Sequence, residues 1–408
     1  MASIRKMRER YYVLYDWYDL TGKRRQKSES FFSKEEAMIR KSEIEFLKRS
    51  GRWIKQSDKT TKQFLLEWIS IHAKKYWQHQ TYSSTLLFFE NHVFPHIGDI
   101  PVNRLSPIHI DSLISTLRTT KTIRQSSGNE LTKYLSGTTI RYIYTQLKQA
   151  MDDAVAWKLL CSNPVTCKPP KKDYHEQPIW TPDIVLQALN EIPKHSLLHL
   201  AVHLSFVCSL RIGEILGITL DCIDLSNNRI LIDKAIQRIS KNAFDELPNN
   251  NISKVLTSIV QNSTSLLVLK TPKTKTSIRY VYFSDVLKEE IEKRLVTREK
   301  ENVYFSHLYN DHNLLFALED GSPIEPGLCS KWFRKWQRSN WPDREPLVFH
   351  GLRHSSATYK LLLSNGDYKT VQKDTGHASA DVLLNIYAHS QEENRKALIQ
   401  RIELDLYK

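Results

Sequence analysis

Six side chains that can handle a phosphate group or a proton are spread over the second half of this 408-residue sequence. Two are arginines, which bind phosphoryl oxygens bidentately and stay charged at neutral pH. A lysine and two histidines can donate or accept protons, and a tyrosine becomes a nucleophile when a base or nearby cations favour its phenolate. Such a set could cleave one phosphodiester, with the cations neutralising the negative charge of a pentacovalent transition state. The six residues are Arg211, Lys275, His350, Arg353, His377 and Tyr387.

The local spacing of these residues adds detail. His350 and Arg353 are three residues apart, which places them on one face of a helical turn. Arg211 lies in an apolar run, where a buried arginine needs an anion, and Glu214 follows three residues later. Glu214 could be that anion, but we expect phosphate to be the main ligand and Glu214 to orient the cations.

Two lysines could fill the lysine position of this set. Lys275 lies at the polar centre of the hairpin-like segment 272–279, close to the presumed turn. Lys273 is two residues away and therefore on the same face of an extended segment, so it is the alternative acid and otherwise a DNA contact.

In this order along the chain, the motifs resemble those of the tyrosine recombinases, the family of the phage lambda integrase. The resemblance covers residues 179–408 at the level of motifs. It implies a site-specific DNA recombinase, with the integrase or excisionase activity of a mobile element such as a prophage or a conjugative transposon. The DNA would be cleaved and rejoined through a 3′-phosphotyrosyl intermediate, without a metal or other cofactor. By this resemblance, Arg211 would be the first arginine of the family, Glu214 the acidic residue that follows it, and Lys275 the lysine of the hairpin. His350 and Arg353 would be the His-x-x-Arg pair, His377 the histidine of the third motif and Tyr387 the nucleophile.

Two other functions compete with this interpretation. A type IB topoisomerase uses a similar cation cluster and a tyrosine to relax DNA, but the small size and the basic N-terminal region count against it. A DNA-binding regulator with a decayed site is disfavoured because all six residues are present. A metal-dependent nuclease would need clustered carboxylates, and no Asp-x-Asp or His/Asp cluster lies near these motifs.

The composition favours a polyanionic partner. The chain has 59 Lys and Arg against 45 Asp and Glu, a formal net charge of +14. No apolar run approaches the ~20 residues of a membrane-spanning helix, and the N-terminus is not that of a signal peptide. We therefore expect a cytoplasmic protein that binds double-stranded DNA. The five cysteines are odd in number and unpaired in spacing, which favours buried free thiols.

The sequence pattern around these residues predicts the helices and strands that position them, and together these elements indicate a multidomain α+β protein. Residues 1–57 read as a small β-β-α module, with strands over 11–18 and 26–32 and a helix over 33–49 that Ser33 caps. The module resembles the arm-type DNA-binding domain of integrases, and we expect its basic hairpin to contact DNA. A basic β-module without a ligand is the alternative. The hairpin residues are Lys23, Arg24, Arg25 and Lys27.

Residues 58–163 read as an all-α unit that resembles the core-binding domain of the family, with a polar loop over 119–133. Prolines and lysines over 164–178 predict a linker that lies along the phosphate backbone, with Lys171 and Lys172 as contacts.

Residues 179–408 would form a mainly α catalytic domain with a small β-sheet. We expect a helix over 197–210 that leads directly to Arg211, a strand over 229–232 paired with 265–270, and a terminal helix over 391–406 that packs in cis or on a neighbouring protomer. Segment 236–264 is longer than a hairpin needs and receives no role. The resemblance further implies core and arm attachment sites, a homotetramer on DNA, and an accessory DNA-bending or excision factor.

Overall fold

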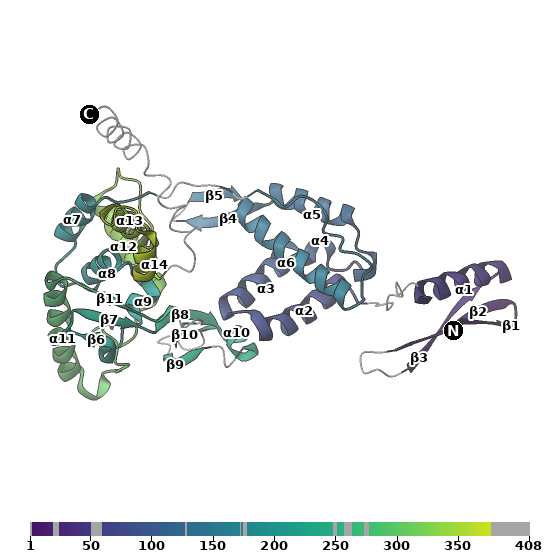
Figure 1. The fold of residues 1–408 in the computed structure, drawn as a ribbon, viewed down its shortest axis with the longest axis horizontal. Helices are drawn as coiled ribbons and strands as arrows, with labels where there is room; N and C mark the ends of the chain where they lie inside the picture. Colours follow the sequence, from purple (N-terminus) through teal and green to yellow (C-terminus); the bar gives the residue numbers. More distant parts are fainter. Residues whose placement is uncertain are drawn as a thin grey trace, which may run out of the picture. The chain divides into compact units, whose positions relative to one another are not determined.

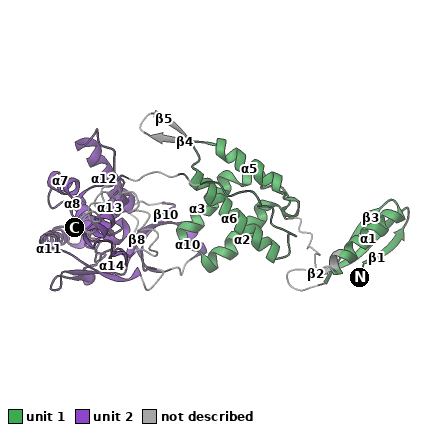
Figure 2. Cartoon of the chain, turned by 45° about the horizontal axis from the view of Figure 1, so that its top comes forward, with its two compact units in different colours: residues 1–174 green, residues 175–408 purple. Residues whose placement is uncertain are grey.

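The computed structural model describes residues 2–18, 24–49, 59–126, 129–171, 173, 178–247, 251–256, 263–272 and 277–376. The chain divides into two compact units, residues 1–174 and 175–408 (Figures 1 and 2). Several predicted features lie outside the described residues: Lys23, Lys172, Lys273, Lys275, His377, Tyr387 and the helix expected over 391–406.

The first unit begins with a three-stranded antiparallel sheet of order β1-β2-β3 and one helix (Figure 1). The elements are β1 (Ala2–Met7), β2 (Arg10–Tyr18), β3 (Arg24–Phe31) and α1 (Lys34–Arg49). The two predicted strands are confirmed as β2 and β3, but a third strand was not predicted: Ala2–Met7 pairs along the whole of its length with β2. Its signal in the sequence is weak, since only Ala2 and Ile4 place apolar side chains toward the small core. The predicted cap is confirmed: the Glu36 N–H donates to Ser33 Oγ at 3.1 Å.

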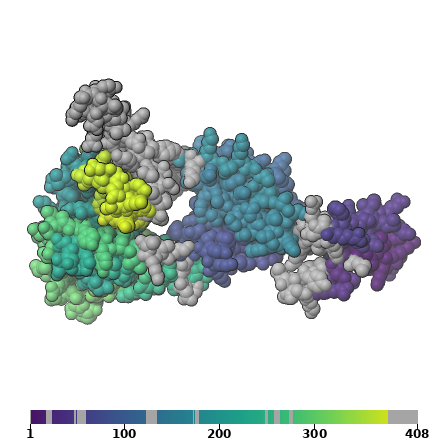
Figure 3. Space-filling model, viewed as in Figure 1, coloured from purple at the N-terminus to yellow at the C-terminus, as the bar shows by residue number. Residues whose placement is uncertain are grey.

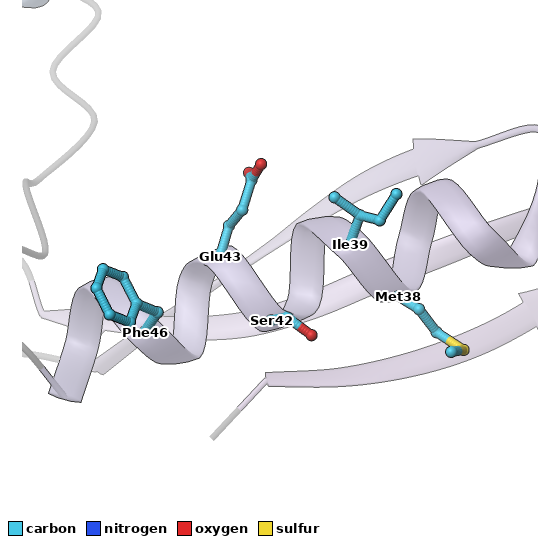
Figure 4. A pocket seen from close by; sticks show the side chains of 5 residues that line it. All are labelled: Met38, Ile39, Ser42, Glu43 and Phe46. Carbon is cyan, nitrogen blue, oxygen red and sulfur yellow. The ribbon is translucent and has the colours of Figure 1, made fainter.

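Helix α1 leaves apolar side chains outside this small core. Met38 is 50% exposed, Ile39 62% and Phe46 63%, and together with Ser42 and Glu43 they line a groove on the helix (Figure 4). The sheet is covered by other positions of the helix, Ala37 and Ile44, which are fully buried. The module therefore carries an apolar surface that its own fold does not use.

The remainder of the first unit is mainly helical. Its helices are α2 (Thr61–Tyr76), α3 (His79–His92), α4 (Phe94–Ile97), α5 (Pro107–Thr119) and α6 (Gly137–Ala156). The prediction of an all-α unit was wrong, because the polar stretch before α6 forms an antiparallel hairpin of β4 (Lys121–Ser126) and β5 (Asn129–Tyr134). Part of the expected linker packs on α6: Tyr144 Oη donates to the Cys167 carbonyl at 2.8 Å, and Arg141 donates to the Pro170 carbonyl at 2.9 Å.

The second unit surrounds one large apolar core with helices. The helices are α7 (Pro182–Glu191), α8 (Leu197–Val207), α9 (Ile212–Leu216), α11 (Asp285–Phe305), α12 (Pro326–Asn340), α13 (Phe349–Leu363) and α14 (Tyr368–Thr375). Helix α8 ends at Val207 and does not reach Leu210 as predicted. Ser209 adopts a positive φ of 52°, which breaks the helix and turns the chain before Arg211.

Two small sheets lie in this unit where one was expected (Figure 1). The first has the order β11-β7-β6, from β6 (Ile223–Asp224), β7 (Arg229–Ile232) and β11 (Arg279–Tyr282). The second has the order β8-β10-β9, from β8 (Ala235–Ser240), β9 (Ile252–Leu256) and β10 (Ser265–Lys270), with α10 (Lys241–Glu246) after β8. The predicted pairing of 229–232 with 265–270 was therefore wrong. The unassigned segment 236–264 supplies β8, α10 and β9 among its described residues.

Three of the five free cysteines are buried: Cys208, Cys222 and Cys329. Cys161 is exposed and Cys167 is half-buried, so the expectation of buried thiols is confirmed only for the second unit. Among the described helices, none is both long and apolar enough to span a membrane.

Candidate active site

Arg211 lies between α8 and α9, where it is the N-cap of α9. Its backbone N–H donates to Glu214 Oε2 at 2.9 Å and its Nη1 donates to Glu214 Oε1 at 2.9 Å. The Glu214 side chain is only 11% exposed, whereas the Arg211 side chain is 43% exposed. Glu214 therefore anchors Arg211 from the protein side and leaves much of the guanidinium open to solvent.

Arg353 belongs to α13 and is fully buried. Its Nη1 donates to the Ser209 carbonyl at 2.5 Å and its Nη2 to the Thr375 carbonyl at 2.6 Å. Its Nη1 also lies 3.8 Å from Glu214 Oε2. The structure thus brings Arg353 together with Arg211 and Glu214, from α13 and from the start of α9.

A third arginine completes the cluster and was missed by the sequence analysis. Arg279, the first residue of β11, donates from Nη1 and Nη2 to the two Glu214 oxygens at 3.3 and 3.2 Å. In the structure, Arg279 and Val281 alternate with exposed Tyr280 and Tyr282. That period of two indicates that Arg279 points inward with Val281.

The three arginines also face the end of α14. Three consecutive carbonyls each accept from a different guanidinium: Asp374 from Arg279 Nε at 3.2 Å, Thr375 from Arg353 Nη2 at 2.6 Å, and Gly376 from Arg211 Nη2 at 3.5 Å. The last carbonyls of a helix carry partial negative charge, so cations are favoured there. Gly376, at a φ of 67°, ends the helix immediately before His377 in the sequence. In Figure 3, the yellow surface belongs to the described residues nearest the C-terminus, in α13 and α14.

The charges of the cluster do not cancel. Burial acts to raise the pKa of Glu214, but Arg279 and then Arg211 outweigh it and hold the pKa at about 2. Burial, followed by the charge of Arg211, lowers the pKa of Arg353 to about 9, so it remains charged at neutral pH. Three guanidiniums around one carboxylate leave an excess of two positive charges, which suits an anionic ligand.

His350 lies one helical turn before Arg353 in α13 and retains exposed surface. Removal of water by the surrounding protein lowers its pKa to about 4, and His354, Arg353 and Arg211 act in the same direction. The His354 ring meets it edge to face, with 4.6 Å between centroids. His350 is therefore neutral at physiological pH and can accept a proton or a hydrogen bond.

The structure thus joins Arg211, Glu214, His350 and Arg353, whereas Lys275, Lys273, His377 and Tyr387 lie outside the described residues. Among the described residues, no group of three His, Cys, Asp or Glu side chains is placed to hold a metal ion.

The candidate DNA contacts of the N-terminal module divide between the two faces of its sheet. Arg25 lies opposite Trp17 and Lys27 opposite buried Tyr15, so both project from the face that α1 covers. Arg24 projects from the open face and forms an ion pair of 2.6 Å with Asp16. The same parity places Arg5 and Arg10 on the open face, and the sequence analysis missed both. Lys171, in the first unit, is exposed.

Comparisons with known proteins match two regions of the chain. A model of the phage integrase family matches residues 182–394, and a model of the SAM-like N-terminal domain of phage integrases matches residues 60–118. A tyrosine recombinase XerC-like protein of Caldanaerobacter subterraneus is 28% identical over 265 residues, which are 62% of this chain and 63% of that protein. The ICEBs1 integrase of Bacillus subtilis is 25% identical over 277 residues, which are 66% of each chain.

Both matches span less than two thirds of the relative's own length. Among solved structures, the Tn1549 transposon integrase in complex with a circular intermediate DNA has a TM-score of 0.63 at 18% identity. That likeness covers 84% of this chain and 99% of the other, and at this identity it concerns the fold.

Proposed function

This chain belongs to the phage integrase family, and from that membership we propose that it is a site-specific DNA recombinase of a mobile element. It would cleave and rejoin DNA through a 3′-phosphotyrosyl intermediate. The observation that carries the proposal is the cluster of Arg211, Arg279 and Arg353 around Glu214, which has an excess of two positive charges. The cluster contacts the residues that directly precede His377, ten positions before Tyr387 in the sequence. The matches to integrases do not favour the topoisomerase or the decayed regulator.

In the proposed reaction, the phenolic oxygen of Tyr387 attacks the phosphorus and displaces the 5′ oxygen of the next nucleotide. One bond from oxygen to phosphorus forms and one breaks, so no external energy source is required. The guanidinium of Arg211, which is open to solvent, would bind a non-bridging oxygen and stabilise the additional charge of the transition state. His350, which is neutral, would accept a proton, and Lys275 would donate one to the leaving oxygen. His377 would donate a hydrogen bond to the same phosphate.

Recombination joins two duplexes, so four strands must be cleaved and each protomer supplies one tyrosine. We therefore propose a homotetramer on double-stranded DNA in the cytoplasm, with core sites held by residues 58–163 and 179–408 and with Lys171 on the phosphate backbone. The N-terminal module would bind separate arm sites through the open face of its sheet, where Arg5, Arg10 and Arg24 project. Integration and excision would then depend on an accessory DNA-bending or excision factor that brings arm and core sites together.

The test is covalent trapping on a nicked core site whose short end diffuses away after cleavage. The wild-type protein should accumulate a protein–DNA adduct through a 3′ phosphate. Tyr387→Phe should bind the same DNA and form no adduct. An adduct formed by Tyr387→Phe would show that another residue is the nucleophile, and no adduct from the wild type on any candidate site would refute the proposed reaction.

A further inference from the structure

We propose that Arg279 is a positioning residue of this site: it fixes Glu214 and the end of α14, and it does not bind the phosphate. This inference rests on the proposed function, because the step it serves is the cleavage assigned to the same arginine cluster.

The first argument is the different exposure of two arginines that share one carboxylate. The Arg279 side chain is 7% exposed, against 43% for Arg211. All three nitrogens of Arg279 already donate to protein acceptors: Nη1 and Nη2 to Glu214, Nη1 also to the Ser277 carbonyl at 3.4 Å, and Nε to the Asp374 carbonyl. Four of the five guanidinium N–H donors are thus bonded to protein acceptors on a side chain that is 7% exposed, so Arg279 is built into the protein side of the cluster.

The second argument is that the hydrogen bonds from Arg279 to Glu214 also position the other two arginines. Glu214 uses the same two oxygens to hold the backbone N–H and the Nη1 of Arg211, and it lies 3.8 Å from Arg353. Because Arg279 holds both oxygens, the carboxylate plane is fixed. Arg279 therefore acts on Arg211 and Arg353 through Glu214.

The third argument is the contact with the end of α14. The Arg279 guanidinium lies against Gly376, where a Cβ atom would be 3.0 Å from its Cζ, Nε and Nη1 atoms. Any larger residue at 376 would push the guanidinium away, and the φ of 67° is strained for other residues. Lys360 forms an ion pair with the side chain of Asp374, whose carbonyl Arg279 holds. One side chain thus connects β11, α9 and the residues that immediately precede His377.

The experiment compares Arg279→Met with a matched control, Arg238→Met. Arg238 is also a strand arginine that pairs with a glutamate, Glu325 at 2.8 Å, but that pair is exposed and contains no member of the cluster. Single-turnover cleavage of the nicked core site is measured at saturating DNA, with the dissociation constant and the unfolding temperature measured in parallel. We expect Arg279→Met to cleave about 100-fold more slowly, the loss that a misplacement of ~1 Å can cause. Its dissociation constant should stay within about threefold of the wild-type value, since ground-state phosphate contacts are retained. Arg238→Met should match the wild type.

The pH profile separates positioning from a general structural effect. The charged groups that face Glu214 are Arg211 from the segment before α9, Arg279 from β11 and Arg353 from α13. Protonation of His350, with a pKa of about 4, gives the wild type and the variant a shared acid limb. Without Arg279 the pKa of Glu214 rises, so its protonation should add a second acid limb to the profile of Arg279→Met. In the double variant Arg279→Met/Glu214→Gln this additional acid limb should be absent. A rate that falls equally at every pH would overturn the proposal.

The remaining outcomes are also decisive. If the wild type forms the adduct and Arg279→Met cleaves at the wild-type rate, the positioning role is wrong while the proposed function stands. If the wild type forms no adduct, both fail. Should Arg279→Met not fold, Arg279→Lys replaces it, because one ammonium can pair with Glu214 but cannot also reach the Asp374 carbonyl. Arg279→Lys should retain the wild-type acid limb with a rate reduced about tenfold, and an unchanged rate would overturn the proposal.

Discussion

Glu214→Gln should destabilise residues 175–408 by roughly 3 kcal/mol at pH 7 in the absence of DNA. Glutamine preserves the size and one acceptor oxygen, but its NH2 group replaces the other oxygen, so the change removes the charge together with two of the hydrogen bonds that Glu214 accepts. The magnitude follows from the fall in the pKa of Glu214 from its ordinary 4.5 to about 2, at about 1.36 kcal/mol for each pH unit. It agrees with the cost of about 3–5 kcal/mol for removing one partner of a buried ion pair.

Scanning calorimetry of the full chain measures this loss. A domain of this size shifts by about 2–4 °C per kcal/mol, so the transition of residues 175–408 should fall by roughly 6–12 °C. The matched control is Glu325→Gln, which removes the exposed partner of Arg238. Exposed pairs contribute about 0–1 kcal/mol, so this control should shift the transition by less than about 4 °C.

The contribution of Glu214 to stability should also depend on pH in a predictable direction. The pKa of Glu214 is lowered in the folded state, so its contribution is fully present above about pH 4.5 and is lost as the pH falls toward about 2. The difference between wild type and Glu214→Gln should therefore be constant near neutral pH and shrink below pH 4.5. Equal transitions at pH 7, or a difference that persists unchanged down to about pH 2, would refute the reasoning.

Three further predictions concern the chemistry and the DNA contacts. Cleavage should survive excess EDTA, because fixed guanidiniums supply the charge that a metal would otherwise provide; loss of the chemical step with DNA binding intact would contradict this. Lys275→Ala should be rescued by a substrate with a 5′-bridging sulfur, whose leaving group needs no proton, far better than Arg211→Ala, which should lose on the order of 10²–10³ in rate. Rescue of Lys273→Ala in its place would transfer the role to Lys273. Deleting residues 1–57 should flatten the dependence of log K on log salt for arm-containing DNA, by about 0.9 for each phosphate that the module neutralises, while core-site cleavage persists. An unchanged salt slope would favour a protein contact, for which the apolar surface of α1 around Met38, Ile39 and Phe46 is available.

Local signals predicted the helical framework well. Ser33 marked the start of α1, because a cap acts within one turn. The pairing of Arg211 with Glu214 was equally local, three residues apart in one capping arrangement. These features were predictable because the residues that decide them are neighbours in the sequence.

Strand partners could not be predicted in the same way. Strand β10 looked suitable for β7, but β7 pairs with β11 and β10 pairs with β8 and β9. Pairing is decided by burial against distant elements, and the short apolar strands of this chain carry similar patterns. Arg279 was missed for the same reason: its partners Glu214 and Asp374 are 65 and 95 residues away. The positive φ of Ser209, which ends α8 early, has no marker such as glycine in the sequence.

The bonds between the arginines and carbonyls 374–376 have a consequence for measured affinities. The N–H groups that Arg211 and Arg353 can offer an anion are partly the ones that hold Gly376 and Thr375. A hydrogen bond to a charged group contributes about 1.5–3 kcal/mol net. When an anion takes one of these donors, the free energy of its new hydrogen bond is reduced by that of the lost hydrogen bond to the carbonyl. An anion that takes one of these donors therefore competes with the end of α14 for it, and linkage makes that competition reciprocal. A weak affinity for free phosphate at this cluster would report that competition, and it would understate the intrinsic attraction of the cations.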